Sequence, residues 1–331
     1  MLGDDCVRTL RRGSPATLSA KMSVMRSVLL AGSESPWLRR HGPHLPFIRK
    51  AVTRFMPGER LEDALRAAAE LRHHGIGAVL TELGENVSCV AAADDITSHY
   101  IEASIQIRGK ALDCHISVKL TQLGLDVDHA RCRSNLRALL AHAREHHTFV
   151  WIDMEQHTYV DATLEIYRDA LSAFSNVGVC LQAYLYRTVN DLNALLPLGG
   201  GVRLVKGAYR ERSDIAMPKK RDVDDSFLSL AKTMMGRDAR ESGLRAVFGT
   251  HDACLINAIQ RHMDSTGEPR ESAEFHLLFG IQRAEQARLA REHYRARILI
   301  SYGEQWFPWY MRRLAERPAN VLFVAKSMLS K

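Results

Sequence analysis

The segment 148–182, TFVWIDMEQHTYVDATLEIYRDALSAFSNVGVCLQ, decides the fold of this chain. It begins and ends with short apolar runs, TFVWID (148–153) and VGVCLQ (177–182), and holds a helix-like stretch, DATLEIYRDALSAFS (161–175), between them. Apolar runs without polar alternation are typical of strands that are buried on both faces of a parallel sheet. The segment therefore predicts a strand–helix–strand unit with two parallel strands.

The same alternation of apolar runs and helical patterns continues over most of the chain. GERLEDALRAAAELRHHG (58–75) has the apolar spacing of an amphipathic helix and ends at Gly75. The apolar runs are IGAVLT (76–81), HISVKL (115–120), TFVWID (148–153), VGVCLQ (177–182), VRLVKG (202–207), AVFGT (246–250), FHLLFG (275–280) and RILIS (297–301). Eight parallel strands separated by helices close naturally into a barrel. We therefore predict an α/β protein with a (β/α)8 barrel of the TIM type at 76–331, preceded by N-terminal helices at 22–75.

A doubly wound sheet is the competing fold, and the glycines of the chain argue against it. A dinucleotide-binding sheet places GxGxxG between its first strand and the following helix. Here GIGAVL (75–80) lacks the third glycine, and the glycines of GGGVRLVKGAY (199–209) precede a strand. We interpret LGGG (198–201) as the turn that leads into the fifth strand.

The positive charge of the chain is concentrated near its N-terminus. Of 45 Lys and Arg and 38 Asp and Glu, residues 1–60 carry 11 and 4, which leaves 34 and 34 for the rest. A basic arm on a neutral body is compatible with peripheral contact to an anionic membrane, and a solvated extension explains it equally well. Residues 1–21 are expected to be a basic extension, either disordered, similar to a transit peptide, or upstream of a start at Met22 or Met25. Because no aromatic interleaving or RNA-binding motif accompanies the charge, nucleic acid is not expected as a partner.

The cysteines and the hydropathy pattern indicate the compartment. The six cysteines lie far apart, without a CxxC pair and without a signal peptide before them, so neither a zinc site nor a disulfide framework is indicated. No apolar run approaches the roughly 18 residues of a membrane-spanning helix. We expect a cytoplasmic protein, with contact to the inner face of a membrane as a hypothesis.

Polar side chains stand near the carboxyl ends of the predicted strands, where the active site of such a barrel lies. Lysine and arginine within or directly after buried strands are hard to explain by packing, because buried cations are rare unless they are paired. The strand-end residues are Thr81, Glu85, Lys119, Asp153, Glu155, Gln182, Tyr184, Arg203, Lys206, Tyr209, Thr250, His251 and Asp252. Each alone has a structural explanation, such as a lysine that reaches solvent at the rim. Together they predict a site for a small anionic ligand or cofactor.

The stretch YMRRLAERPAN (310–320) follows the eighth predicted strand and brings two more arginines to this end of the barrel. Paired arginines on a helix usually form a solvated face, but Arg312 and Arg313 fall near the start of their helix. Guanidinium groups beside unpaired backbone N–H groups favour a carboxylate or a phosphate. Glu316 lies one turn later and is expected to steer one guanidinium. We interpret the pair as a carboxylate clamp.

Three other classes of protein were compatible with parts of this pattern. A Schiff-base aldolase would use Lys119 or Lys206. A protein that only binds anions or nucleic acid would need the basic arm alone and would leave the strand ends unexplained. The main alternative is a metal-dependent hydrolase or lyase, although three histidine ligands do not appear at strand ends and the cations oppose a metal. Its ligands would be Asp153, Glu155, His251 and Asp252. We expect no metal.

Several stretches together resemble the FAD-dependent proline dehydrogenases, the first enzymes of proline catabolism, in their monofunctional bacterial form. The resemblance covers most of residues 22–331. Its motifs are LGENV (83–87), SVKLTQLG (117–124), WIDME (151–155), LQAYLYRT (181–188), VRLVKGAY (202–209), THD (250–252) and YMRRLAERPAN (310–320). It implies a (β/α)8 barrel that binds FAD without a dinucleotide-binding fold, in agreement with the missing glycine fingerprint.

The resemblance also implies roles for individual residues. Asp153 and Arg203 would be catalytic, with Arg203 near N5 of the flavin and Asp153 organising the polar site near Lys119. Glu85 would pair with an arginine to close a gate. The proline carboxylate would be held by Lys119, Arg312 and Arg313, and the proline ring would lie beside Tyr209, Leu277 and Leu278. FAD would be held by Met154 through its backbone, Gln182, Lys206, Gly207, Ala208, Thr250 and His251.

The implied reaction is hydride transfer from C5 of L-proline, with its amine neutral, to N5 of the flavin, which gives Δ1-pyrroline-5-carboxylate. An arginine-rich site would stabilise negative charge on the reduced flavin. Electrons would pass to a membrane quinone. Because no second domain follows residue 331, a separate pyrroline-carboxylate dehydrogenase would take the product. The family has tyrosines commonly at Leu299 and Trp309 and often at Phe279, so the pocket around the substrate ring is expected to differ.

Overall fold

The computed structural model describes residues 52–307 and residue 310. The chain divides into two units, Phe55–Glu304, and Met1–Arg54 together with Gln305–Lys331. The barrel lies wholly within the first unit, which also contains the helix predicted at 58–75. The basic extension, most of the predicted N-terminal helical segment, and Trp309, Arg312, Arg313 and Glu316 lie outside the described residues.

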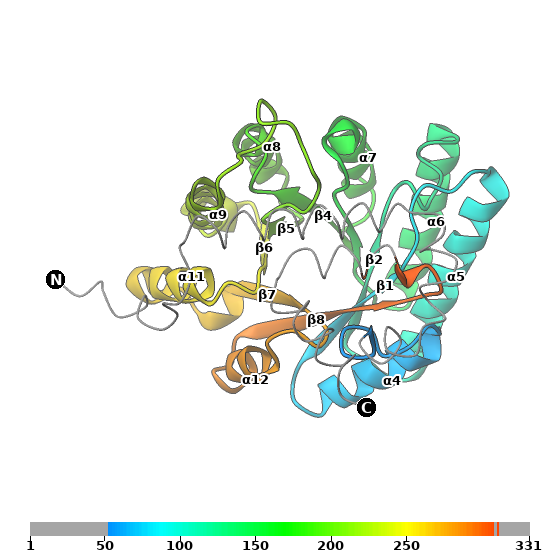
Figure 1. Cartoon of the computed structure of the whole chain (residues 1–331), viewed down its shortest axis with the longest axis horizontal. Coiled ribbons are helices and arrows are strands. Elements are labelled where there is room, and N and C mark those ends of the chain that lie inside the picture. The colour runs from blue at the N-terminus through cyan, green and yellow to red at the C-terminus, as the bar shows by residue number, and fades with distance from the viewer. Residues whose placement is uncertain (1–51, 308–309, 311–331) are drawn as a thin grey trace, which may run out of the picture. The chain divides into compact units, whose positions relative to one another are not determined.

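Eight parallel strands close into a barrel in their order along the chain (Figure 1). The strands are β1 Gly77–Glu82, β2 Cys114–Val118, β3 Val150–Ile152, β4 Val177–Gln182, β5 Gly201–Val205, β6 Arg245–Gly249, β7 Ala273–Leu278 and β8 Arg295–Tyr302. Closure occurs between β1 and β8, where Gly77 to Glu82 pair in parallel with Arg297 to Tyr302. All eight apolar runs are confirmed as strands, with each end within two residues of the predicted one.

Helices connect the strands and lie outside them (Figure 1). They are α4 Leu61–Arg72, α5 Val90–Gly109, α6 His129–Glu145, α7 Val160–Leu171, α8 Thr188–Leu195, α9 Lys220–Met234, α10 Arg237–Glu241, α11 Ala253–Thr266 and α12 Arg283–Arg291, with 3-10 turns η2 His157–Tyr159, η3 Leu196–Leu198 and η4 Arg270–Ser272. Side-chain oxygens of Asp128 and Asp252 cap α6 and α11 by accepting from backbone N–H groups. Gly267 ends α11 in the left-handed conformation that suits glycine. These local signals mark the start of α6 and both ends of α11.

The strands are buried on both faces, as their apolar runs predict. Successive side chains on a strand point to opposite faces. On β7, Phe275 and Leu277 belong to the large apolar core, and Glu274 and His276 alternate with them toward the interior of the barrel. A separate small apolar cluster inside the barrel consists of Val79, Trp151 and Val247, with Phe149 and Leu299 packed against it. The interior of the barrel therefore contains buried polar side chains, such as Glu274 and His276, next to this small apolar cluster.

Candidate active site

Arg203 of β5 is the centre of a polar group inside the barrel, here named the Arg203 cluster, which also contains Asp153, Ser117 and Cys180. The Arg203 side chain is only 3% exposed and forms an ion pair with Asp153. Its guanidinium donates to Ser117 Oγ at 2.8 Å and to Cys180 Sγ at 2.8 Å. Ser117 Oγ in turn donates to Asp153 Oδ1 at 3.0 Å. A cation this deeply buried is tolerated because its donors are paired.

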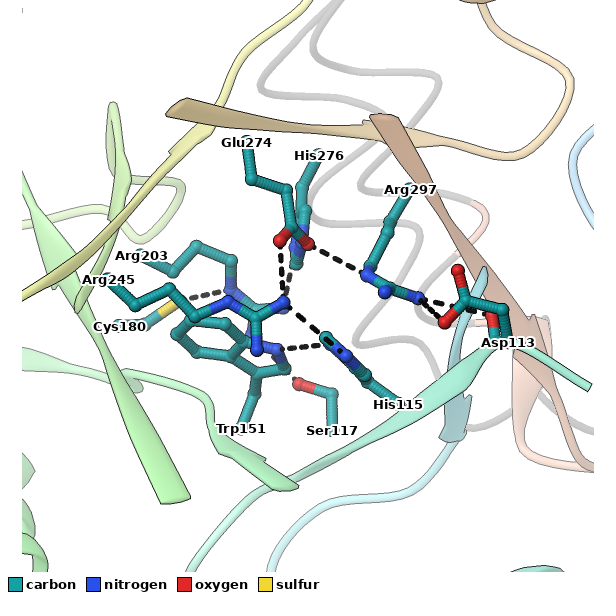
Figure 2. Close-up of polar contacts among 10 residues, drawn as sticks. All are labelled: Asp113, His115, Ser117, Trp151, Cys180, Arg203, Arg245, Glu274, His276 and Arg297. Atoms are coloured by element: carbon teal, nitrogen blue, oxygen red, sulfur yellow. Dashed lines mark hydrogen bonds and ion pairs between the residues drawn. The ribbon is translucent and has the colours of Figure 1, made fainter. Parts of the chain in front are cut away.

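A second polar group, here named the Glu274 cluster, lies nearer the amino ends of the strands and consists of Glu274, His276, Arg245 and Arg297 (Figure 2). Glu274, 3% exposed, accepts from His276 Nε2 at 2.6 Å and from Arg245 Nη2 at 2.5 Å, and Arg297 Nε lies 2.9 Å from its Oε1. Burial alone would raise the pKa of this carboxyl. The hydrogen bond from His276 and the two arginine charges outweigh burial and hold the pKa well below its ordinary value. Glu274 is therefore ionised.

His276 joins the two clusters. Its Nδ1 lies 3.4 Å from Arg203 Nη1, and its Nε2 lies 2.6 Å from Glu274 Oε1. Burial lowers the pKa of His276 to about 4 despite the neighbouring carboxylate. The ring is therefore neutral at neutral pH. Since Glu274 can only accept, Nε2 carries the ring proton and Nδ1 offers its lone pair to Arg203.

The side chains of His115, Glu274 and His276 lie close enough together to suggest a metal site, with ligand atoms within 4.8 Å of one another. Their lone pairs already have protein donors, because Trp151 Nε1 donates to His115 Nδ1 at 3.1 Å and the Glu274 cluster engages the rest. A metal ion there would also face the guanidinium groups of Arg245 and Arg297. The group is a satisfied charge network rather than a metal centre.

The ligand set of the metal-dependent hydrolase predicted as an alternative is also engaged elsewhere. Asp153 pairs with Arg203, and Asp252 with Lys206 and Lys220. Both carboxylate oxygens of Glu155 accept from Thr121, and His251 Nε2 accepts from the backbone N–H of Leu278 at 3.1 Å. These four side chains thus serve separate contacts, and the alternative is not supported.

The turn after β2 carries Lys119 and is held by side chains from neighbouring elements. The backbone N–H of Lys119 donates to Gln122 Oε1 at 3.1 Å, and Gln122 Nε2 donates to the carbonyl of Glu82 at 2.9 Å. Glu155, 4% exposed, accepts from the backbone and hydroxyl of Thr121. Burial raises the pKa of Glu155 to about 7, although Thr121 and Lys119 favour its charged form. The half-buried Lys119 therefore extends from a braced turn.

Beyond β4 and β5, Gln182 and Gly207 mark a region that is here named the cradle. Gln182 is 3% exposed, and its Oε1 has no hydrogen-bond donor among the described residues, whereas its Nε2 donates to the carbonyl of Met154 at 3.5 Å. Gly207 has φ +111, and a Cβ there would lie 2.2 Å from the ring of Tyr184. Only glycine fits this backbone conformation and spacing. The adjoining Ala208 is exposed.

Lys206, which the sequence predicted as a ligand-binding residue, forms ion pairs with two carboxylates of the protein. Its Nζ lies 2.5 Å from Asp224 on α9 and 2.8 Å from Asp252, and Lys220 joins the same two carboxylates. Burial alone would raise the pKa of Asp252, but the two lysines lower it to about 2. Thr250 Oγ1 accepts from the backbone N–H of Asp252 at 3.1 Å. The charges of the two lysines are thus balanced by the two carboxylates of Asp224 and Asp252.

The remaining predicted site residues fall into different environments. Tyr209 is half-buried in the loop after β5. Leu277 is 1% exposed and packs in the large apolar core, whereas Leu278, the next residue, shares the interior face with His276. Sequence reasoning missed Ser117, Cys180, Glu274 and His276. The signal that could have found them is their even spacing along the strands, two residues before Lys119 and Gln182 and two and four residues before Leu278, which puts them on the interior face.

The fold and this arginine-centred interior define the class of protein, a (β/α)8 barrel with a buried and paired arginine inside it. A family model described as Proline dehydrogenase matches residues 64–326. Proline dehydrogenase 1 of Bacillus subtilis (strain 168) is 36% identical over 283 residues, which is 86% of this chain and 92% of that protein. Proline dehydrogenase of Deinococcus radiodurans is 36% identical over 285 residues, 83% of this chain and 89% of that protein. The chain belongs to the proline dehydrogenase family.

Solved structures confirm the fold. Proline utilization A from Bdellovibrio bacteriovorus, inactivated by N-propargylglycine, superposes with a TM-score of 0.76 at 22% identity and covers 86% of this chain. Proline utilization A from Bradyrhizobium japonicum superposes with a TM-score of 0.69, also at 22% identity, over 85% of this chain. The chain spans about a third of the length of these larger proteins, 34% and 32%. At this identity, the likeness supports the barrel alone.

Proposed function

We propose that this protein oxidises L-proline to Δ1-pyrroline-5-carboxylate with FAD as its bound cofactor. The observation that carries the proposal is Arg203, a fully paired cation fixed inside the barrel of a proline dehydrogenase family member. A buried arginine that faces the ligand site favours negative charge as it develops there. When bound, FAD supplies the acceptor for the hydride that leaves C5 of proline.

The residues beyond β4 and β5 fit a flavin. Gln182 Oε1 is a buried acceptor without a donor among the described residues, and the ring system of a flavin offers an N–H donor. Gly207 lets the backbone pass close to the Tyr184 ring because it carries no side chain, and we assign the exposed backbone at the adjoining Ala208 to the ligand. Lys206 already shares two carboxylates, so we assign the cradle chiefly to this backbone. Met154, Thr250 and His251 complete the proposed cofactor contacts.

Substrate binding is assigned to the cations at the carboxyl ends of the strands. Lys119 extends from its braced turn, and the proposed clamp of Arg312 and Arg313 supplies the other charges for the proline carboxylate. Asp153 holds Arg203 and directly follows β3, which pairs with β2, the strand before the Lys119 turn. Orienting the substrate in this way brings its C5 to the acceptor without a proton transfer from the protein at C5. We assign the proline ring to Tyr209 and, from its interior placement, Leu278 in place of Leu277.

Two further partners belong to the proposal. Electrons would leave through a quinone, and a separate pyrroline-carboxylate dehydrogenase would take the product. Because quinones reside in membranes, the basic arm within residues 1–60 would hold the protein at an anionic surface. Among the described residues, no helix has the length and apolar character needed to cross a bilayer. Trimming residues 1–21 should weaken binding to anionic liposomes and slow quinone reduction, and unchanged values for both would refute the role of the arm.

The decisive test of the activity is the colour of the purified protein. Flavin absorbance that bleaches anaerobically on addition of L-proline supports the proposal. D-proline and L-proline methyl ester are the matched controls, since one inverts the stereocentre and the other lacks the carboxylate charge, and both should bleach the flavin far more slowly. Protein that is colourless and also fails to bind added FAD would rule the proposal out.

A further inference from the structure

His276 is a buried imidazole between two charged groups, Arg203 and Glu274. Only Arg203 has a role in the proposed function. On one side lies Arg203, which the proposed function places at the ligand site, and on the other lies Glu274, nearer the amino ends of the strands (Figure 2). Burial of the ring is nearly complete, at 5% exposure. Trp151 meets the ring edge-on, with 5.6 Å between the ring centroids. The imidazole is thus fixed in position by groups from two other strands, Arg203 of β5 and Trp151 of β3, and by Glu274 on β7.

Each donor group of the Arg203 guanidinium points to a different partner. Nε donates to Cys180 and Nη2 to Ser117 and Asp153, which leaves the Nη1 edge facing His276 Nδ1 at 3.4 Å. A buried charged donor without an acceptor is unfavourable, so a guanidinium that lost His276 would turn to find one. His276 therefore limits how far the Arg203 guanidinium can turn toward the amino ends of the strands.

Glu274 determines which ring nitrogen of His276 can accept from the Arg203 guanidinium. Its carboxylate accepts from Nε2 and is itself held by Arg245 and Arg297, so the ring proton stays on Nε2. Nδ1 is then a bare acceptor aimed at Arg203. A protonated ring would instead bring a second cation and an N–H donor against the guanidinium, and both would repel it.

We propose that His276, oriented by Glu274, is a positioning residue that fixes the guanidinium of Arg203 for hydride acceptance by the bound flavin. The inference rests on the proposed function, because it takes Arg203 as the cation next to the flavin. Displacement of Arg203 would reduce stabilisation of negative charge in the reduced state while leaving the proline carboxylate contacts in place. His276 would thus act on kcat and on the flavin potential rather than on KM.

The test compares three variants of the full chain loaded with FAD. His276→Leu removes both ring contacts, His276→Gln keeps one acceptor and one donor, and His115→Leu removes another buried imidazole of the interior that does not contact Arg203. We expect His276→Leu to lower kcat about tenfold with the proline KM within about threefold of the parent. Its reduced flavin should lose about tenfold in relative stability, which for a two-electron couple is a midpoint potential about 30 mV more negative.

The other variants decide between positioning and packing. His276→Gln should restore most of kcat and of the potential, and His115→Leu should lower the melting temperature with little change in either. If His276→Leu and His115→Leu shift kcat and potential equally, or if His276→Gln rescues neither, the proposed positioning role is wrong.

A second measurement does not need the flavin. In protein labelled with ¹⁵N-histidine, the His276 ring is assigned by the resonance that His276→Gln lacks. We expect a neutral ring with a bare Nδ1 from about pH 5 to about pH 8. A ring that titrates in this range, or that carries its proton on Nδ1, would overturn the inference. Protein that binds no FAD would refute the proposed function, while this measurement would still test the contact between His276 and Arg203.

Discussion

Arg203 and Asp153 form an ion pair across the interior of the barrel, although 50 residues separate them in the chain. Arg203 lies in the middle of β5 and Asp153 directly follows β3, so the closure of the sheet brings their side chains together inside the barrel. The contact neutralises a buried cation, and in the proposed function it also holds that cation at the ligand site. The first prediction tests that contact.

Replacing Asp153 by Ala should destabilise the protein by about 3 kcal/mol, because it leaves Arg203 buried without its counter-charge. Asp153→Asn keeps an acceptor for Arg203 and should lose less. The measurement is urea unfolding at pH 7, with Asp169→Ala as the control. Asp169 pairs with Arg137 at the surface, where its side chain is 40% exposed, so its removal should cost under about 1 kcal/mol. Equal losses for Asp153→Ala and Asp169→Ala would contradict the prediction.

Replacing Gly207 by Ala should destabilise the protein and release flavin. A methyl group there would lie 2.2 Å from the Tyr184 ring, and the backbone has φ +111. Gly267→Ala is the matched control, since Gly267 has φ +69 with nothing within 4 Å of a Cβ and should lose only about 1 kcal/mol from backbone strain. Thermal melts and the flavin-to-protein absorbance ratio measure both effects. Full flavin retention in Gly207→Ala would argue against the cradle.

Two buried groups should give opposite slopes of stability against pH. The pKa of His276 is lowered from 6.5 to about 4, so between these values only the unfolded chain binds the proton and stability falls as pH falls. The pKa of Glu155 is raised from 4.5 to about 7, so in that window only the folded chain holds the proton and stability falls as pH rises. Each contributes up to about 1.4 kcal/mol per pH unit.

The two contributions are separated by single variants. His276→Gln should make the slope of unfolding free energy between about pH 5 and about pH 6 more negative, and Glu155→Gln should make it more positive. Urea titrations at fixed pH values measure the slope. Shifts of the same sign in both variants would show that at least one of the two groups does not titrate as described.

Replacing Gln122 by Leu should raise the proline KM about tenfold while flavin stays bound, because Gln122 fixes the backbone of the Lys119 turn. Lys119→Met should raise it at least as much. Gln260→Leu is the control: Gln260 is also buried, on α11, and accepts from Arg288. Steady-state kinetics with flavin content measured on each sample checks the prediction. A Gln122→Leu protein that is less stable but has the parental KM would limit Gln122 to a structural role.

Replacing Arg312 by Ala should raise the proline KM roughly ten- to hundredfold with FAD retained, because a charge-assisted hydrogen bond contributes about 1.5–3 kcal/mol. Arg221→Ala on α9, which removes an arginine 89% exposed, should leave KM unchanged. Loss of flavin together with an unchanged KM in refilled enzyme would show that Arg312 serves the cofactor instead.

The sequence predicted the secondary structure well because its signals are local. The eight apolar runs are confirmed as strands within two residues, helices lie between them where the helical spacing predicted them, and the lack of a glycine fingerprint agrees with a closed barrel in place of a dinucleotide-binding sheet. Strand ends also marked Lys119, Asp153 and Arg203 as site candidates, because lysine or arginine next to a buried run is unusual.

The sequence did not show which side chains of each strand point into the barrel and which point outward. Strands buried on both sides do not alternate in polarity, so the run FHLLFG did not reveal that His276 and Leu278 face the interior while Leu277 packs outward. Likewise, nothing near Lys206 in the sequence pointed to Asp224, which α9 brings to it.

By itself, then, the sequence determined a barrel of eight strands and the family, and it singled out cations at the strand ends as site candidates, because periodicity and motifs are properties of neighbouring residues. The tertiary structure alone decided which side chains meet inside the barrel. His276 reaches Arg203 across 73 residues of chain, and Arg245 reaches Glu274 across 29, because closure and the register of parallel strands set those distances. Arg203 was thus recognisable from the sequence, and its partners were not.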